Sequence, residues 1–390
     1  MIYSASLICP ISIPPIVNGW IETDSEGTII SVNDSPAPDN AIMLQGILIP
    51  GFVNTHCHLE LSHLRGRISE NTGMTEFIRT LLAQRFTIPM EEQFAAMQYA
   101  EDEMLKNGIV AVGDISNFDS SLQIKNNNRL YYHTFVEVLG LNPEHAENII
   151  EKAITLKEQF SAVANHTSSI VPHAPYSVST PLLELINSLG TGDPVSMHME
   201  ESEDEDQFCR KKNGPLAAFY QEMGINFESF PAEEDKSPIE QILPELDQCD
   251  QLMMVHNTLL TSEEMQWAEN KNQNLTWCLC PSANQYITNT LPDFYLFNST
   301  THKVTIGTDS LASNHHLSIL DELYLIQQTA PMIPFENLLR WATINGAVFL
   351  KIDHQFGSLE IGKKPGLVLL ENIETDNPVI RNDTSVRKIN

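Results

Sequence analysis

Short apolar or β-branched segments alternate with longer amphipathic segments along most of this chain, and this alternation limits the fold more than any other feature. Eight segments are predicted strands, at residues 47–56, 108–116, 130–140, 168–175, 194–200, 251–257, 275–281 and 303–310. The helical periodicity between them, as in residues 90–108, is typical of repeated βα units. Eight such units over about 300 residues predict an α/β fold of the (β/α)8 TIM-barrel type.

The two ends of the chain have a different pattern. Residues 19–34 predict a β-hairpin with a Ser-Glu-Gly turn, and residues 357–373 contain further strand-like segments. We therefore expect residues 1–47 and 354–390 to pair into one small β-sandwich domain. The barrel is then expected to span residues 48–353.

The composition excludes several classes of partner. With 22 Lys and Arg against 51 Asp and Glu, the net charge of −29 repels nucleic acids and anionic membranes. The N-terminal segment has prolines in its apolar part and no early Lys or Arg, unlike a secretory signal. The six cysteines contain no Cys-x-x-Cys pair, in keeping with reduced thiols. We expect a cytoplasmic homodimer that acts on a small molecule, with no nucleic-acid or membrane partner.

Polar side chains stand at the carboxyl ends of most predicted strands. They are His56, His58, Asp114, Asn117, Glu137, His173, His198, His256 and Asp309. In a barrel these ends meet on one face. Because side chains alternate along a strand, His56 and His58 point the same way while Cys57 points away. Imidazole nitrogens and a carboxylate such as Asp309 suit zinc or iron and leave room for water, so the pattern predicts a catalytic metal site.

Each of these signals has a structural alternative. An isolated His-x-His pair or a single strand-end histidine is more often an ordinary hydrogen-bonded residue, and only the joint pattern favours a metal. Asn117 and Glu137 are candidates for contacts with a ribose or a base edge, or else for a buried pair within the barrel. Cys278 and Cys280 share one face of a strand, where burial is favoured over metal binding.

The motifs resemble the amidohydrolase superfamily, and within it the mononuclear purine-type deaminases. The matching segments lie between residues 50 and 323 and read PGFVNTHCHLELS, VPHAPYSVS, SMHMEES, VHN, CPSANQYI and IGTDSLASNHHLSILDEL. The metal ligands implied by the resemblance are His56, His58, His198 and Asp309. One divalent ion, zinc or iron, is expected, because His173 stands where binuclear members carry a carboxylated lysine.

The resemblance also implies a catalytic set and an activity. The implied catalytic residues are Glu201 as proton shuttle, His256 polarising the hydroxide and leaving group, and Asp309. His173 would contact the substrate base. Such a site deaminates an aminated purine-like base or nucleoside to its keto form and releases ammonia. Glu200, next to the shuttle, is expected to be solvated, as is most of the acidic run at residues 198–207, which otherwise suits a helix start.

Within this family, the segments GDISN, FVEVLG and DSLASNHHLSILDEL are most similar to the 6-aminodeoxyfutalosine deaminases of the alternative menaquinone pathway. This likeness implies an adenosine derivative with a modified 5′ side as substrate. The alternatives are a guanine- or cytosine-type deaminase, and an amidohydrolase that acts on another C–N bond or on a chlorinated heterocycle. A metal-binding protein without turnover is a further alternative, against which Glu201 and His256 argue.

Overall fold

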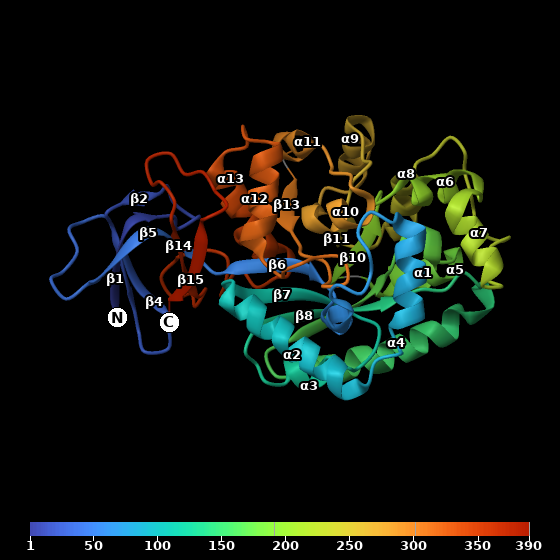
Figure 1. Cartoon of the computed structure of the whole chain (residues 1–390), viewed down its shortest axis with the longest axis horizontal. Helices are drawn as coiled ribbons and strands as arrows, with labels where there is room; N and C mark the ends of the chain where they lie inside the picture. Colours follow the sequence, from blue (N-terminus) through green and yellow to red (C-terminus); the bar gives the residue numbers. More distant parts are fainter. Residues whose placement is uncertain (191, 301, 390) are drawn as a thin grey trace.

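The computed structural model describes residues 1–190, 192–300 and 302–389. Two of its three sheets have four parallel strands each, in the orders β6-β7-β8-β9 and β10-β11-β12-β13 (Figure 1). The strands are β6 (Phe52–Cys57), β7 (Ile109–Ser116), β8 (Tyr131–Val138), β9 (Thr167–Pro172), β10 (Pro194–Met199), β11 (Gln251–His256), β12 (Leu275–Leu279) and β13 (Lys303–Ile306). Each overlaps its predicted range, so the prediction of eight strands is confirmed.

The two parallel sheets meet at both of their edges. On one side, the backbone N–H of His198 in β10 donates to the carbonyl of His173, just after β9, at 2.9 Å. On the other side, the N–H groups of Thr308 and Asp309 donate to the carbonyl of His56 in β6 at 3.0 and 3.1 Å. These contacts continue the strand order from β9 to β10 and from β13 back to β6.

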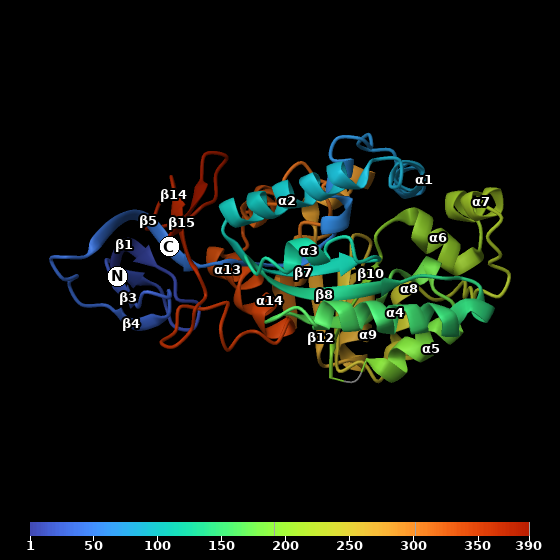
Figure 2. The same cartoon turned by 90° about the horizontal axis from the view of Figure 1, so that it is seen from below.

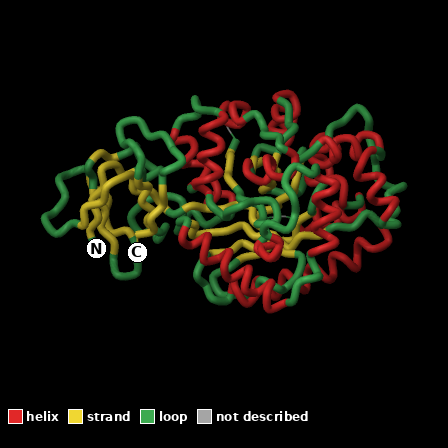
Figure 3. The backbone as a smooth tube through the Cα atoms, in the orientation of Figure 1, coloured by secondary structure: helices red, strands yellow, loops and turns green. Residues whose placement is uncertain are grey.

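Helices lie outside the parallel strands (Figures 1 and 2), as the red helices around the yellow strands of Figure 3 show. They are α1 (Met74–Gln84), α2 (Met90–Lys106), α3 (Leu122–Lys125), α4 (Ala146–Ser161), α5 (Thr180–Leu189), α6 (Glu203–Lys211), α7 (Gly214–Glu222), α8 (Pro238–Ile242), α9 (Ser262–Lys271), α10 (Pro281–Thr288), α11 (Phe294–Ser299), α12 (Ile319–Thr329), α13 (Phe335–Ala342) and α14 (Ile344–Phe349). Short 3₁₀ helices are η1 (Leu59–Leu64), η2 (Pro143–His145), η3 (Pro175–Ser177) and η4 (Leu243–Leu246). In α4, Ile150, Ala153 and Phe160 are buried, which is the spacing of one helical face.

Within the described part of the chain, no helix combines the length and apolar character needed to cross a bilayer.

The two ends of the chain form the third sheet. Its strand order is β15-β14-β5-β1-β3-β4, with β2 beside β1. The strands are β1 (Ile2–Ile8), β2 (Ile16–Val17), β3 (Trp20–Thr23), β4 (Ile29–Asn33), β5 (Ile42–Pro50), β14 (Leu367–Glu371) and β15 (Ser385–Ile389). The predicted hairpin is present as β3 and β4, which pair antiparallel. The prediction of a sandwich is wrong, because all described strands here belong to one sheet. A register shift between Ala5 and Leu7 bends it, and its side chains enclose a small apolar core.

The first predicted barrel strand, residues 47–56, is divided between two sheets. Its first part belongs to β5, which pairs with β1 and β14, and its second part is β6, which pairs with β7. Gly51 lies at the crossing, where a Cβ atom would stand 2.3 Å from a methyl carbon of Val110 and 2.8 Å from the carbonyl oxygen of Pro365. Only glycine fits there, and the Pro50-Gly51 pair is the sequence signal of the break that the prediction of one continuous strand overlooked.

Candidate metal centre and active site

Three histidines from two strands turn ring nitrogens toward one point. His56 lies in β6, His58 follows it, and His198 lies in β10. The Nε2 atom of His58 is 3.1 Å from Nε2 of His56 and 3.3 Å from Nε2 of His198. Oδ1 of Asp309 lies 3.2 Å from Nε2 of His58 and 3.6 Å from Nε2 of His56. Four ligand-type atoms from three strand ends therefore surround one small space.

The protonation of these side chains fits a bound cation. Burial lowers the pKa of His58 to about 4 and that of His198 well below its usual value, so both rings are neutral at pH 7. Burial opposes ionisation of Asp309, but the hydrogen bond from His56 and the neighbouring histidines hold its pKa well below the usual range. Burial opposes protonation of His56, but the hydrogen bond and charge of Asp309 raise its pKa, so this ring shares a proton with the carboxylate that a bound cation would replace. Imidazole nitrogens and a carboxylate oxygen together are donors of the kind that zinc takes. The ligand atoms of the three histidines lie within 4.8 Å of one another, close enough to bind one metal ion.

His256 is held beside this cluster in a fixed orientation. It ends β11 with a φ of 77°, a left-handed backbone conformation that is uncommon for residues other than glycine. Its Nδ1 lies 2.7 Å from Oδ1 of Asn284 in α10, which can only accept, so Nδ1 carries the proton. Its Nε2 is thereby left as an acceptor, 3.5 Å from Oε1 of Glu201. Sequence reasoning missed Asn284, although the matching segment CPSANQYI contains it.

Glu201 is a buried carboxyl group on a tightly bonded turn. Burial, with the nearby charge of Asp309, raises its pKa well above the usual value. The backbone N–H groups of Glu200 and Glu201 donate to the carboxylate of Glu205 in α6 at 3.1 and 2.8 Å. A buried carboxyl group whose pKa is raised, beside a metal site, is suited to acid–base catalysis. Sequence reasoning also missed Glu205, whose only signal was its place four residues after Glu201.

The expectation that Glu200 is solvated is wrong. Its side chain is only 2% exposed, and its Oε1 accepts a hydrogen bond from the backbone N–H of Ile239 in α8 at 3.1 Å. The φ of Glu200, 51°, takes its backbone out of the extended conformation of β10, and α8 covers its side chain. The acidic run does begin a helix, as expected: Ser202 caps α6 and accepts from the N–H of Glu205 at 3.3 Å.

The three predicted substrate contacts lie next to the metal cluster. Ligand-type atoms of Glu137, His173 and His198 lie within 4.8 Å of one another. Nδ2 of Asn117 donates to Oε2 of Glu137 at 2.9 Å. The other carboxylate oxygen, Oε1, is buried and has no hydrogen-bond partner among the described residues, 3.6 Å from Nδ1 of His198. Glu137 is thus hydrogen-bonded to Asn117 through Oε2, and its Oε1 can still accept a hydrogen bond.

Asp114 does not join the site, although its position at a strand end suggested it. Its Oδ2 forms an ion pair with Nζ of Lys125 in α3 at 2.6 Å, and both side chains are fully buried. Its Oδ1 accepts the backbone N–H of Leu59 at 2.8 Å. Asp114 therefore holds the chain just after His58 and does not itself line the site.

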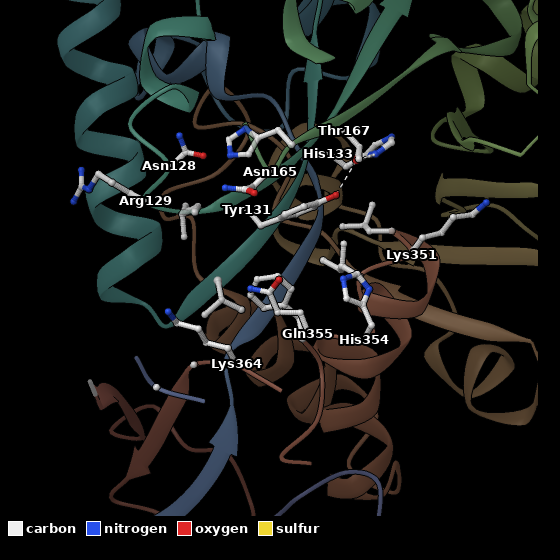
Figure 4. A pocket seen from close by; sticks show the side chains of 18 of the residues that line it. Asn128, Arg129, Tyr131, His133, Asn165, Thr167, Lys351, His354, Gln355 and Lys364 are labelled. Carbon is white, nitrogen blue, oxygen red and sulfur yellow. Dashed lines mark hydrogen bonds between the residues drawn. The ribbon is translucent and has the colours of Figure 1, made fainter. Parts of the chain in front are cut away.

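A large cavity lies elsewhere in the molecule (Figure 4). Its volume is about 870 Å³, and it is lined by residues at the amino ends of β8 and β9, among them Tyr131, His133 and Thr167. Figure 4 shows these three side chains together, with the Tyr131 hydroxyl 2.7 Å from Oγ1 of Thr167. Catalytic residues of barrel enzymes lie at the carboxyl ends of the strands. Because this cavity is at the opposite ends, we do not assign the chemistry to it.

Comparison with known proteins gives relatives over nearly the whole chain. The aminodeoxyfutalosine deaminase of a Nitratiruptor species is 26% identical over 284 residues, covering 71% of this chain and 66% of that relative. The chain thus matches just under two thirds of that relative's length. The crystal structure of Helicobacter pylori aminofutalosine deaminase with methylthio-coformycin has a TM-score of 0.80 at 22% identity, covering 96% of this chain and 93% of that one.

A second solved structure belongs to a protein with a different activity. The zinc complex of atrazine chlorohydrolase from Arthrobacter aurescens has a TM-score of 0.73 at 15% identity, covering 94% of this chain and 86% of that one. At such identities both structures indicate a shared fold and nothing finer. The model of the Amidohydrolase family matches residues 47–389, most of the chain. This protein therefore belongs to the amidohydrolase family.

Proposed function

We propose that this protein is a metal-dependent hydrolytic deaminase of 6-amino purine nucleosides, with aminodeoxyfutalosine or a related adenosine derivative as substrate. The observation that carries the proposal is the convergence of His56, His58 and His198 with Asp309, beside a buried pair of Glu201 and His256. The substrate class comes from the relatives, whose names include aminodeoxyfutalosine deaminase and adenosine deaminase.

We further propose that the eight parallel strands close into a (β/α)8 barrel over residues 48–353. The hydrogen bonds at both junctions between the four-stranded sheets support this. Residues 1–47 and 354–390 would form the second, smaller β domain, which the seven-stranded terminal sheet supports. The homodimer and the cytoplasmic location stay predictions.

The proposed ligands of one divalent ion, zinc or iron, are His56, His58, His198 and Asp309. When bound there, such an ion lowers the pKa of a water molecule toward ~7. Glu201 would take the proton from the attacking water and deliver it to the ring nitrogen next to the carbon under attack. Glu201 would then take the remaining proton from the hydroxyl group added to the ring carbon and pass it to the departing amine, so that the C–N bond breaks as the keto group forms, ammonia leaves, and a single carboxyl group serves both steps. His256, held by Asn284, would accept a hydrogen bond from the attacking water and keep it in line.

Substrate positioning falls to side chains on three neighbouring strand ends. His173 would contact the purine base, and Nδ1 of its ring lies 2.7 Å from Oγ of Ser177, which orients it. Glu137 would accept from a ribose hydroxyl or a base edge through its unpaired Oε1. Asn117 fixes the other oxygen of that carboxylate and so aims it.

The test is ammonia release from a panel assayed under one condition. We expect kcat/KM to be highest for aminodeoxyfutalosine, 5′-methylthioadenosine or adenosine, and low for AMP, guanine and cytosine, because a chain of net charge −29 disfavours phosphates. Highest activity on guanine or AMP would overturn the substrate class but leave a deaminase. Chloride release from a chlorotriazine without ammonia from any purine would overturn the deaminase and favour the chlorohydrolase alternative.

Metal content provides a separate prediction. After dialysis, the protein is expected to hold about one divalent ion per chain by elemental analysis. His198→Ala removes one of the clustered nitrogens and is expected to lower both metal content and activity, whereas His145→Ala, at an exposed histidine, should leave both unchanged. A metal-free chain with full activity, or two firmly held ions per chain, would contradict the proposed ligand set.

A further inference from the structure

The cavity of about 870 Å³ lies where the parallel strands meet the terminal sheet, at the opposite ends of the strands from the metal cluster (Figure 4). It is lined by the amino ends of β8 and β9, by the segment after α14, and by residues at the start of β14 and the end of β15. Small-molecule sites have volumes of about 300–1,000 Å³ and often lie where two parts of a protein meet. The cavity therefore has the size and place of a ligand site.

The charges around this cavity have the opposite balance to those of the whole chain. It is lined by four Lys or Arg side chains and two Asp or Glu side chains, whereas the chain has 22 and 51. The cations are Arg129, Lys351, Lys364 and Lys388. Figure 4 shows Arg129 and Lys364 on one side of the Tyr131 ring and Lys351 on the other. This local excess attracts anions that the overall charge of −29 would otherwise repel.

Two of these cations, Lys351 and Lys388, have no carboxylate partner within the described residues. Lys351 donates to one backbone carbonyl, which leaves two of its three N–H donors. Partial burial, and after it the charge of Arg129, lowers the pKa of Lys388, so an anion beside this ammonium group would be stabilised. The other two cations are already paired, Arg129 with acids outside the cavity and Lys364 with Glu26 at 3.6 Å.

Three rings line the cavity together. The ring centroid of Tyr131 is 5.9 Å from that of Phe356 and 6.0 Å from that of His166. Nδ1 of His166 is buried and has no hydrogen-bond partner among the described residues, which is uncommon for a buried polar atom. Burial lowers the pKa of His166 to about 4, so its ring is neutral at pH 7. The rings thus offer apolar contacts and one unsatisfied polar atom to a flat group.

Other polar groups of the cavity are satisfied by the protein itself. The Tyr131 hydroxyl and Nδ1 of His133 both lie 2.7 Å from Oγ1 of Thr167. These contacts hold β8 to β9, so their role is structural. The ammonium groups of Lys351 and Lys388 are the charged donors that remain for a ligand.

We propose that this cavity is a second binding site, for an organic anion with a flat ring. The ring would lie against Tyr131 and Phe356, and a phosphate or carboxylate group would accept hydrogen bonds from Lys351 and Lys388. Because the metal cluster lies at the other ends of the strands, a ligand there would not compete with the substrate. Binding at this place requires neither the metal ion nor the proposed reaction.

The test titrates uridine, UMP and isophthalate into the zinc-loaded chain by calorimetry, since none of them has the 6-amino group that the proposed reaction removes. We expect UMP to bind about tenfold more tightly than uridine, or about 1.4 kcal/mol, because only UMP has an anionic group for the lysines. Lys351→Met and Lys388→Met should each remove most of that difference. Lys152→Met, at an exposed lysine outside the cavity, should leave it unchanged. Isophthalate shows whether carboxylates are accepted as well as phosphate.

Two further variants separate this site from the metal centre. His198→Ala removes a proposed metal ligand and should leave the affinity for UMP unchanged, whereas Tyr131→Leu should weaken binding of both uridine and UMP. Binding of UMP, of isophthalate or of both, lost in the two lysine variants, supports the site and identifies the anionic group. Equal affinities for uridine and UMP, no binding of either anion, or affinity lost in His198→Ala but kept in both lysine variants would overturn it.

Discussion

Replacing Glu201 with glutamine is expected to lower kcat by at least ~10²-fold while the fold and the metal content are retained, since general acid–base transfer contributes ~10²–10⁴-fold. The amide keeps the size of the side chain and its place 3.5 Å from Nε2 of His256, but it cannot accept and return a proton. Single-turnover kinetics with adenosine, together with elemental analysis of the same preparation, measure both quantities.

Glu200→Gln is the matched control for this variant. Both residues are buried, and their N–H groups bind the same carboxylate of Glu205. Glu200 uses only an acceptor oxygen, toward the N–H of Ile239, and glutamine keeps that oxygen. We therefore expect only a small change in kcat. If both variants lose activity to the same extent, Glu201 is not the proton shuttle.

Replacing Lys125 with methionine is expected to reduce the free energy of unfolding by about 3–5 kcal/mol, the usual cost of leaving one member of a buried ion pair alone. Nζ of Lys125 lies 2.6 Å from Asp114 and donates to the hydroxyl groups of Ser116 and Thr134 at 3.1 and 2.9 Å. Methionine fills a similar volume but leaves the fully buried carboxylate uncompensated. Since Asp114 also binds the N–H of Leu59, next to His58, metal affinity should fall as well.

Urea unfolding of the metal-loaded protein tests this prediction. Lys125→Met with Asp114→Asn in one chain removes both charges and should recover much of the loss, as a double-mutant cycle would detect. Lys157→Met breaks a partly exposed pair with Asp193, 2.8 Å apart, and is expected to cost at most about 1 kcal/mol. If Lys125→Met is as mild as Lys157→Met, the buried pair does not stabilise the parallel strands.

Several features of this protein could be predicted from local pattern alone. Strand and helix periodicity, turn residues and chain order identified all eight parallel strands and the hairpin of β3 and β4. The two-residue repeat of a strand put His56 and His58 on one side, and the carboxyl ends of parallel strands meet at one edge, so His198 and Asp309 could be expected nearby. These inferences depend on backbone geometry, which is the same in every strand.

Other features depended on which distant segments pack together. Gly51 lies where the chain passes from one sheet to the other, and it must be glycine because Val110 and Pro365 leave no room for a side chain. Glu200 and Glu201 are both glutamates, and the sequence does not distinguish their roles. Glu200 has a positive φ and binds the N–H of Ile239, whereas Glu201 lies beside His256. The partners Asn284, Glu205 and Lys125 are also residues that lie close to the site only because distant segments pack together.

The sequence by itself therefore determined the element order, because periodicity is a property of neighbouring residues, and the resemblance of its motifs implied the family and the candidate ligands. Only the tertiary structure decided which carboxyl group is paired and which is free to react. Burial and hydrogen bonding control the protonation of each polar side chain, and both depend on contacts between residues far apart in the chain, such as Asn117 with Glu60 and Glu201 with His256.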